Sequence, residues 1–229
     1  MWRSGRARLA WAMSALGVVT LGAVLAQTTI GEVRALGRQL LPKPPEVARD
    51  IIVSDDDRDG HSATFRILLF SDEFRWRLSS YDRLEHFDAQ PDFSEEMRAV
   101  LNNAREIICV GASSEELAPG MPKTKGRAIE ERRAARRAER IAMWVRSSIS
   151  KPVPIRKLNV GHHMPTRHSG DTSDQRRMVI ILVLDREDET NLDQALRSAM
   201  SRESQRAPIF DTLLTQYSLA NREGFSWVQ

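Results

Sequence analysis

An uncharged run near the amino terminus limits what this 229-residue chain can fold into more than any other feature. Leu9 to Ala26 contains no charged residue, and its two hydroxyl side chains, Ser14 and Thr20, can bond to carbonyls of their own helix. As a helix the run would be about 27 Å long, close to the hydrocarbon thickness of a bilayer. We therefore expect a membrane segment here, and the other roughly 200 residues to make the folded part.

Two interpretations of this segment remain open. Arg3, Arg6 and Arg8 precede the run, and they predict a cytoplasmic amino terminus. Apolar cores of signal peptides are usually about 7–15 residues long, so the length of the run favours an uncleaved transmembrane anchor. Cleavage after Ala26, before Gln27, is the alternative, because small residues stand at the spacing that cleavage needs.

Strand-like and helix-like stretches alternate in the rest of the chain. Residues 31–62 include the sequence LPKPP and end in a polar cluster, which is typical of a linker. Such alternation indicates an α/β fold with helices packed on a sheet. The pattern predicts, in order, a strand over 63–70, a helix capped by Ser94, a strand over 106–111, a helix over 127–149, strands over 156–161 and 176–184, and a short helix over 190–200.

These elements divide the chain into four parts. We expect a basic tail and membrane segment over 1–30, a linker over 31–62, one α/β domain over 63–186 and a helical extension over 187–229. Hydrophobic residues make up 41% of the chain and charged residues 28%, so the chain can bury a core. The single cysteine, Cys109, excludes an intramolecular disulfide, and its apolar neighbours indicate a buried position in a strand.

Three blocks of sequence in the α/β part carry a family resemblance. The first is Gly111-Ala112-Ser113-Ser114 after a strand, and the second is Arg136-Arg137-Ala138 within the long helix. The third is Asn159-Val160-Gly161 with Pro165, followed by Ser173-Asp174-Gln175-Arg176-Arg177-Met178-Val179-Ile180. In this order and spacing they resemble the OmpA-like domain, the peptidoglycan-associated module of outer-membrane proteins, lipoproteins and MotB-type flagellar stators. The resemblance implies a β-α-β-α-β-β domain after a single transmembrane helix.

The resemblance also implies a binding site for the peptide stem of peptidoglycan. In the family, an aspartate and an arginine grip diaminopimelate, whose amine and carboxylate require opposite charges, and arginine can bind a carboxylate through two hydrogen bonds. Arg137 stands at the arginine position and Ser114 at the aspartate position, so Glu115 or Glu116 would supply the negative charge. The site residues that the resemblance implies are Ser114, Glu115, Glu130, Arg137 and Arg177.

Together these features predict a non-catalytic protein of the bacterial cell envelope. The sequence has no nucleophile-elbow, zinc-protease, phosphate-loop or dinucleotide motif, and no cofactor is expected. We expect an inner-membrane anchor through residues 9–26 and a periplasmic domain that binds peptidoglycan or an envelope protein, with self-association also open. The alternative is an assembly protein whose OmpA-like domain has lost peptidoglycan and offers a protein-interaction surface.

Two patterns that suggest metal ligands have simpler interpretations. Residues 55–60 match the opening of a calcium loop, but the twelfth position is Arg66 rather than glutamate, so an acidic turn before a strand is expected. No cysteine or acid pair completes a metal site near the clustered histidines, which are expected in an exposed loop: His162, His163 and His168.

The helix over 127–149 contains seven arginines against three glutamates. A nucleic-acid or anionic-lipid surface is conceivable for such a helix, but a solvated face with acid–base pairs is the simpler interpretation. Export also separates the chain from nucleic acid, so no nucleic-acid partner is expected. The net charge of the whole chain is only +3, which agrees with this interpretation.

Overall fold

The structure of the protein, a computed structural model, describes residues 44–87, 90–114, 122–163, 172–203 and 226–227. All of them belong to the unit Lys43–Gln229. The expected membrane segment and its alternative cleavage site lie outside the described residues. Within the described ranges, no helix is both long and apolar enough to cross a bilayer.

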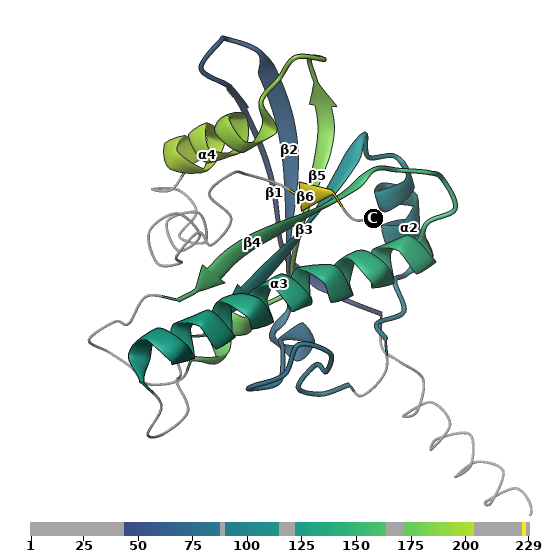
Figure 1. Ribbon diagram of the computed structural model, residues 1–229. Helices are drawn as coiled ribbons and strands as arrows, with labels where there is room; N and C mark the ends of the chain where they lie inside the picture. The colour runs from purple at the N-terminus through teal and green to yellow at the C-terminus, as the bar shows by residue number, and fades with distance from the viewer. Residues whose placement is uncertain (1–43, 88–89, 115–121, 164–171, 204–225, 228–229) are drawn as a thin grey trace, which may run out of the picture. The chain divides into compact units, whose positions relative to one another are not determined.

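Six strands form one mixed sheet: β1 (Val47–Asp56), β2 (Ser62–Phe70), β3 (Glu106–Ser113), β4 (Ile155–His162), β5 (Val179–Arg186) and β6 (Ser226–Trp227). Their order across the sheet is β1-β2-β5-β3-β4-β6 (Figure 1). β3 and β4 are parallel, and the other neighbouring strands are antiparallel. Residues 179–183 of β5 are all buried, as a central strand covered on both faces requires.

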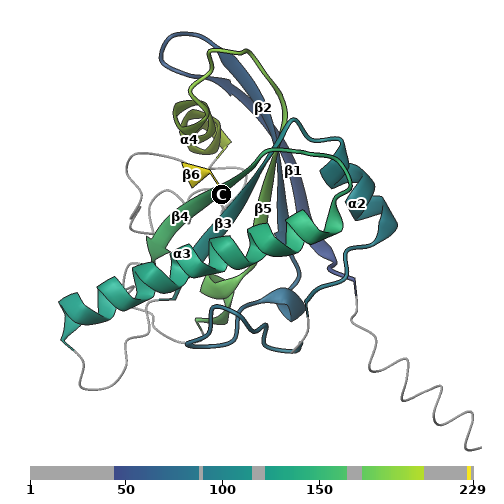
Figure 2. The same ribbon diagram turned by 45° about the vertical axis from the view of Figure 1, so that its right-hand side comes forward.

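Helices cover both faces of the sheet, as Figure 2 shows for α2 (Glu95–Asn102), α3 (Lys123–Ser148) and α4 (Leu192–Glu203). Two short 3-10 helices, η1 (Asp72–Phe74) and η2 (Ser173–Arg176), lie in the connections. From β2 to β5 the main elements follow the order strand, helix, strand, helix, strand, strand, so the expected α/β class and element order are confirmed. Ser94 caps α2 as expected, because its Oγ accepts a hydrogen bond from the Met97 amide at 3.2 Å.

The linker expected over residues 31–62 is wrong from Val47 onward, because residues 47–56 form the edge strand β1. β1 pairs with β2 in antiparallel register, with Val53 opposite Phe65. Val53 is buried, whereas its neighbour Ile52 is 62% exposed. A half-buried edge strand between LPKPP and an acidic cluster lacks the long apolar run of a central strand, which is why the sequence pattern favoured a linker.

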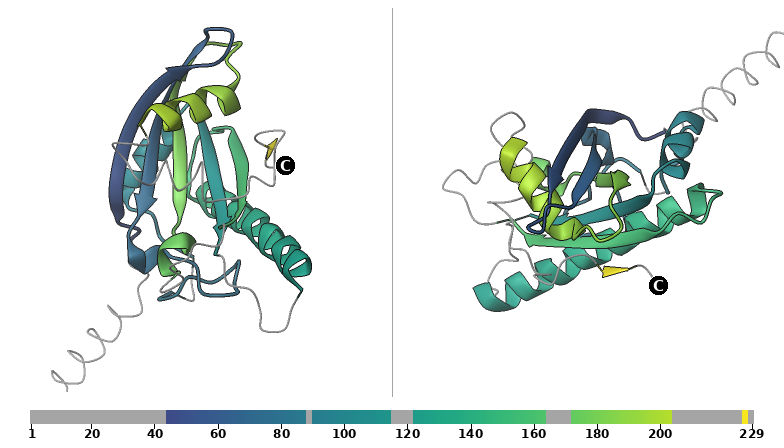
Figure 3. Two further views of the ribbon diagram at one scale, coloured as in Figure 1. Left: turned by 90° about the vertical axis from the view of Figure 1, so that its left-hand side faces the viewer. Right: turned by 90° about the horizontal axis from the view of Figure 1, so that it is seen from above.

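α4 belongs to the same fold as the sheet. It packs on β1 and β2, where Leu192, Leu196 and Met200 join Phe65 in one buried cluster. Figure 3 shows α4 and α3 on opposite faces of the sheet. The boundary that we expected at residue 186 is therefore not a structural boundary.

Residues 71–87, between β2 and α2, complete the core on the α3 face. Phe74, Trp76 and Leu84 are buried there. The rings of Trp76 and Trp144 stack, with centroids 5.3 Å apart and planes inclined by 13°. This packing ties the segment to the long helix.

α3 approaches β3 very closely at Gly111. A Cβ atom at this position would lie 1.9 Å from the carbonyl oxygen of Ala134 and 2.7 Å from the amide nitrogen of Ala138. No side chain fits at such a distance, so glycine is required here. The close approach of α3 to β3 thus depends on three small residues, Gly111, Ala134 and Ala138.

Candidate functional site

Arg137 of α3 lies against the end of β3. Its side chain is buried, with the residue only 1% exposed, and Nη1 donates a hydrogen bond to the carbonyl oxygen of Ala112 at 2.7 Å. The structure thus brings together the first two sequence blocks, Gly111–Ser114 and the arginine of the long helix. This is the juxtaposition that the family resemblance implied.

The rest of the Arg137 guanidinium faces the turn over residues 77–83. Nε and Nη2 donate to the carbonyl oxygen of Ser80 at 2.9 and 2.7 Å, and Nη2 also donates to that of Arg77 at 3.4 Å. The guanidinium carbon lies 5.6 Å from the centroid of the Trp76 ring. An arginine has five N–H groups, and these bonds together with the bond to Ala112 engage four of them with backbone carbonyls. The Nε–Nη2 edge, which suits a two-point grip of a carboxylate, is occupied by Ser80.

The other residues implied by the resemblance are distributed around this arginine. Ser114 is buried just beyond β3, whereas Glu115 and Glu116 lie outside the described residues. Glu130 is buried on α3 and forms an ion pair with Arg133. Its Oε2 atom is also buried, and no donor in the described part of the chain reaches it.

Arg177 lies just before β5, and its described contacts are with the segment over residues 71–87 rather than with Arg137. Its Nη2 atom forms an ion pair with Oδ1 of Asp72 in η1 at 2.8 Å. A backbone bridge also joins Arg177 to Arg75. The described contacts of Arg177 therefore connect β5 to the segment 71–87.

His162 and His163 do not lie in an exposed loop, contrary to our expectation, because β4 extends through His162. Ser113 pairs with His162 in the parallel register, and the His163 amide donates to the Ser113 carbonyl at 2.9 Å. His162 and His163 are buried, while His168 lies outside the described residues. Nδ1 of His162 is 3.5 Å from Oε1 of Glu131. Burial is the main cause that lowers the pKa of His162, although the nearby Glu131 opposes it.

The acidic cluster begins at the end of β1 and continues into the turn that leads to β2, as expected. Oδ1 of Asp57 accepts hydrogen bonds from the amides of Asp59 and His61, both at 2.9 Å. Its Oδ2 accepts one from the amide of Asn191 at 2.8 Å. The bond from Asn191 is the largest cause that lowers the pKa of Asp57. Both oxygens thus serve the backbone, and in the described ranges no three metal-ligating side chains gather.

Cys109 is buried in the core on the α3 face, as its apolar neighbours predicted. Burial raises the pKa of its thiol well above the usual range. The thiolate needed for nucleophilic chemistry is therefore disfavoured at this position.

A pocket that the sequence did not reveal lies between α3 and the turn over residues 77–83. Its volume is about 280 Å³, and its lining consists of Ser79, Tyr81, Ile129, Arg132, Arg133 and Arg136. The spacing of the three arginines along one helix was visible in the sequence. The wall that Ser79 and Tyr81 supply was not, because it depends on how residues 71–87 fold back onto α3.

No family model matches the sequence, and no curated protein does. Among solved structures, the chain is similar to the periplasmic domain of MotB, at 13% identity and a TM-score of 0.34, over 77% of this chain and 92% of that one. It is also similar to the OmpA-like domain of FopA1 from Francisella tularensis subsp. tularensis SCHU S4, at 11% identity and a TM-score of 0.33, over 65% of this chain and 94% of that one. Both similarities are distant, and the fold described above rests on the order and pairing of this chain's own strands.

Proposed function

We propose that this chain is a non-catalytic protein of the cell envelope, anchored in the inner membrane through residues 9–26 and carrying an OmpA-like domain in the periplasm. One observation carries the proposal. From β2 to β5 the elements follow the β-α-β-α-β-β order, and Arg137 of the long helix meets the end of β3. The uncharged run before the domain supports the anchor.

The described contacts of Arg137 count against a grip on the peptidoglycan stem, so the proposal gives the domain a protein-interaction role instead. Four N–H groups of Arg137 are engaged by backbone carbonyls, so a two-point bond to a ligand carboxylate would require the turn over residues 77–83 to move. Among the acidic residues that the resemblance implied, Glu130 is the one within the described ranges, and it lies seven residues before Arg137, about 10 Å along the helix axis. The amine and carboxylate of one diaminopimelate centre are carried on a single carbon atom. Peptidoglycan is therefore the alternative ligand in this proposal.

Sedimentation with purified sacculi distinguishes the two roles. The full chain, purified in a neutral detergent, is mixed with sacculi alongside the Arg137→Lys variant and a matched control, Arg140→Lys, on the same helix. If the domain is an interaction module, the wild type stays in the supernatant, as it does without sacculi. Recovery of the wild type and the control in the pellet, with loss of Arg137→Lys, would establish the peptidoglycan role instead.

A second measurement keeps this test informative if Arg137→Lys fails to fold. A soluble stem peptide containing diaminopimelate releases the wild type from sacculi only if the stem itself is the ligand. The anchor is tested separately, by alkaline extraction of membranes and by sequencing the amino terminus of the mature chain. A mature chain that begins at Gln27 would contradict the anchor.

A further inference from the structure

The pocket between α3 and the turn over residues 77–83 has a strongly cationic lining. Arg132, Arg133 and Arg136 contribute three guanidinium groups, and no acidic residue is among the six that line it. We propose that this pocket binds a phosphate group carried on a small organic molecule. The inference does not depend on the role of Arg137 in peptidoglycan binding.

The charge balance of the pocket fits an anion that carries about two negative charges. Arg133 is paired with Glu130, which neutralises one of the three cations. In the part of the chain that the structure describes, neither Arg132 nor Arg136 forms an ion pair with a carboxylate. Within the described residues, two of the three guanidinium groups are thus without a carboxylate partner. A phosphate monoester carries about −1.5 to −2 at neutral pH, and guanidinium groups bind phosphate oxygens through paired hydrogen bonds.

Two arginines are already oriented before any ligand arrives. The guanidinium carbon of Arg136 lies 4.8 Å from the centroid of the Tyr81 ring. A guanidinium stacked on a ring keeps its N–H groups for other acceptors. Nε of Arg132 donates to the Ala128 carbonyl at 3.1 Å, which leaves the two terminal nitrogens for a ligand. Because these side chains are already ordered, less conformational entropy is lost when a ligand binds.

The wall opposite α3 is held in place by its own hydrogen bonds. The Ser80 amide donates to the Arg77 carbonyl, and Oγ of Ser80 accepts from the amides of Asp82 and Arg83. The buried Arg137 then ties this turn to α3, because its Nε and Nη2 atoms donate hydrogen bonds to the Ser80 carbonyl. Arg137 thus acts as a positioning residue for the pocket wall.

Ser79, at the rim, has a φ of 60°, which is uncommon for a residue other than glycine. Such conformations cost of order 1–3 kcal/mol and persist where the surrounding structure enforces them. They are concentrated at binding sites, and here the strained residue lies at the rim of the cationic pocket. The strain is thus a second feature of the same place, independent of charge.

The size and the apolar wall limit what accompanies the phosphate. The volume of about 280 Å³ lies near the lower end for small-molecule sites, which start at about 300 Å³. Tyr81 and Ile129 offer carbon surface beside the arginines. A glycerol-sized group fits this description better than a nucleotide. Such a phosphate occurs both in soluble esters and in the headgroups of anionic phospholipids.

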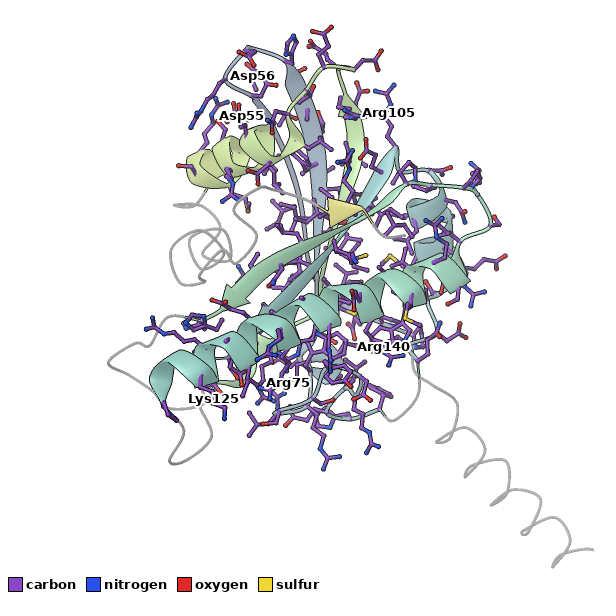
Figure 4. All side chains as sticks on the ribbon, in the orientation of Figure 1. Asp55, Asp56, Arg75, Arg105, Lys125 and Arg140 are labelled. Carbon is purple, nitrogen blue, oxygen red and sulfur yellow. The ribbon has the colours of Figure 1, made fainter. Side chains whose placement is uncertain are left out.

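Calorimetric titration of the full chain in a neutral detergent tests the site. The probes are inorganic phosphate, glycerol phosphate, and mixed micelles that contain either phosphatidylglycerol or phosphatidylcholine. The double variant Arg132→Gln/Arg136→Gln removes the two guanidinium groups that have no carboxylate partner among the described residues. The matched double control, Arg98→Gln/Arg140→Gln, removes two arginines that do not line the pocket, one on α2 and one on α3; Arg140 is labelled in Figure 4.

We expect the wild type and the control variant to bind phosphate with affinities within about twofold of each other. The double pocket variant should bind at least about tenfold more weakly, because each lost charge-assisted hydrogen bond contributes substantially to affinity. Tighter binding of glycerol phosphate than of phosphatidylglycerol micelles identifies a soluble ester as the source of the phosphate. Tighter binding of the phosphatidylglycerol micelles identifies a lipid headgroup. Equal binding by the pocket variant and the wild type, or no saturable binding by the wild type, would overturn the proposal. Unchanged unfolding temperatures show that all variants are folded.

Discussion

Arg137 and Ala112 are joined by a hydrogen bond of 2.7 Å from Nη1 to the carbonyl oxygen, which fastens the middle of α3 to the end of β3. The same guanidinium holds the Ser80 carbonyl with two further bonds. One side chain therefore connects a strand, a helix and a turn that are far apart in the sequence. A buried charge in this position stabilises the fold only while its acceptors stay in place.

Replacing Arg137 with methionine should therefore destabilise the protein by about 3 kcal/mol, since several carbonyls lose a charged donor while the volume of the side chain is roughly retained. Chemical denaturation of the full chain, followed by tryptophan fluorescence, measures this change. The control Arg140→Met, on the same helix, should change stability by less than about 0.5 kcal/mol. Similar losses for both variants would show that the four hydrogen bonds contribute little.

Gly111→Ala should be strongly destabilising, by about 3 kcal/mol or more, because the new Cβ atom would overlap the backbone of α3 at Ala134. Gly60→Ala is the matched comparison. Gly60 has open space around it but a φ of +89°, so alanine there should cost about 1–2 kcal/mol. Thermal or chemical unfolding of the two variants gives the difference. Equal effects would mean that α3 can move away from β3 at little cost.

The parts of this fold that the sequence predicted are those with a strong local period. β5 is a continuous apolar run, and α2 begins at a serine cap, so both could be placed without tertiary information. β1 could not, because its apolar residues are flanked by charged ones and do not form the long run of a central strand. Trp76 and its neighbours lack a period, and they are positioned by packing on Trp144 rather than by their own sequence.

For the site, the resemblance implied that Arg137 and the residues after β3 act on one ligand, and the structure places Arg137 against the Ala112 carbonyl at the end of that strand. What the sequence could not show is that backbone carbonyls engage the guanidinium, because every residue carries a carbonyl and its direction depends on the fold. The cationic pocket was missed for the same reason. Its arginines were visible, but Ser79 and Tyr81 reach them only through the folded turn.

His162 should make stability depend on pH near neutrality. Burial lowers the pKa of His162 below its ordinary value of about 6.5, so the unfolded state binds a proton more readily than the folded state. The stabilisation is complete above about pH 6.5 and is lost as the pH falls below that value, towards the lowered pKa. Glu130, Glu131 and Arg127 are the charged neighbours that modulate the shift.

Urea denaturation of the full chain between pH 7.5 and pH 5 measures this dependence. The variant His162→Gln retains a polar side chain without a titrating ring, so its stability should change less over the same interval. If the wild type and His162→Gln lose stability in parallel, a different group is responsible for the dependence.

Asp57 should couple the β1–β2 turn to the start of α4. Its carboxylate accepts hydrogen bonds from the amides of Asp59 and His61 within the turn and from the amide of Asn191 ahead of α4. The lowered pKa of Asp57 means that this contribution is present above pH 3.8 and is lost as the pH falls through the lower folded value. Asp57→Ala should therefore speed hydrogen exchange at the first turn of α4, whereas Asp188→Ala, which replaces an exposed acid nearby in the chain, should leave it unchanged.

Calcium should not stabilise the β1–β2 turn. Because both carboxylate oxygens of Asp57 accept hydrogen bonds from backbone amides, millimolar calcium should not raise the unfolding temperature of the wild type. A calcium-dependent rise that Asp57→Ala abolishes would show that the turn binds the metal in spite of these bonds.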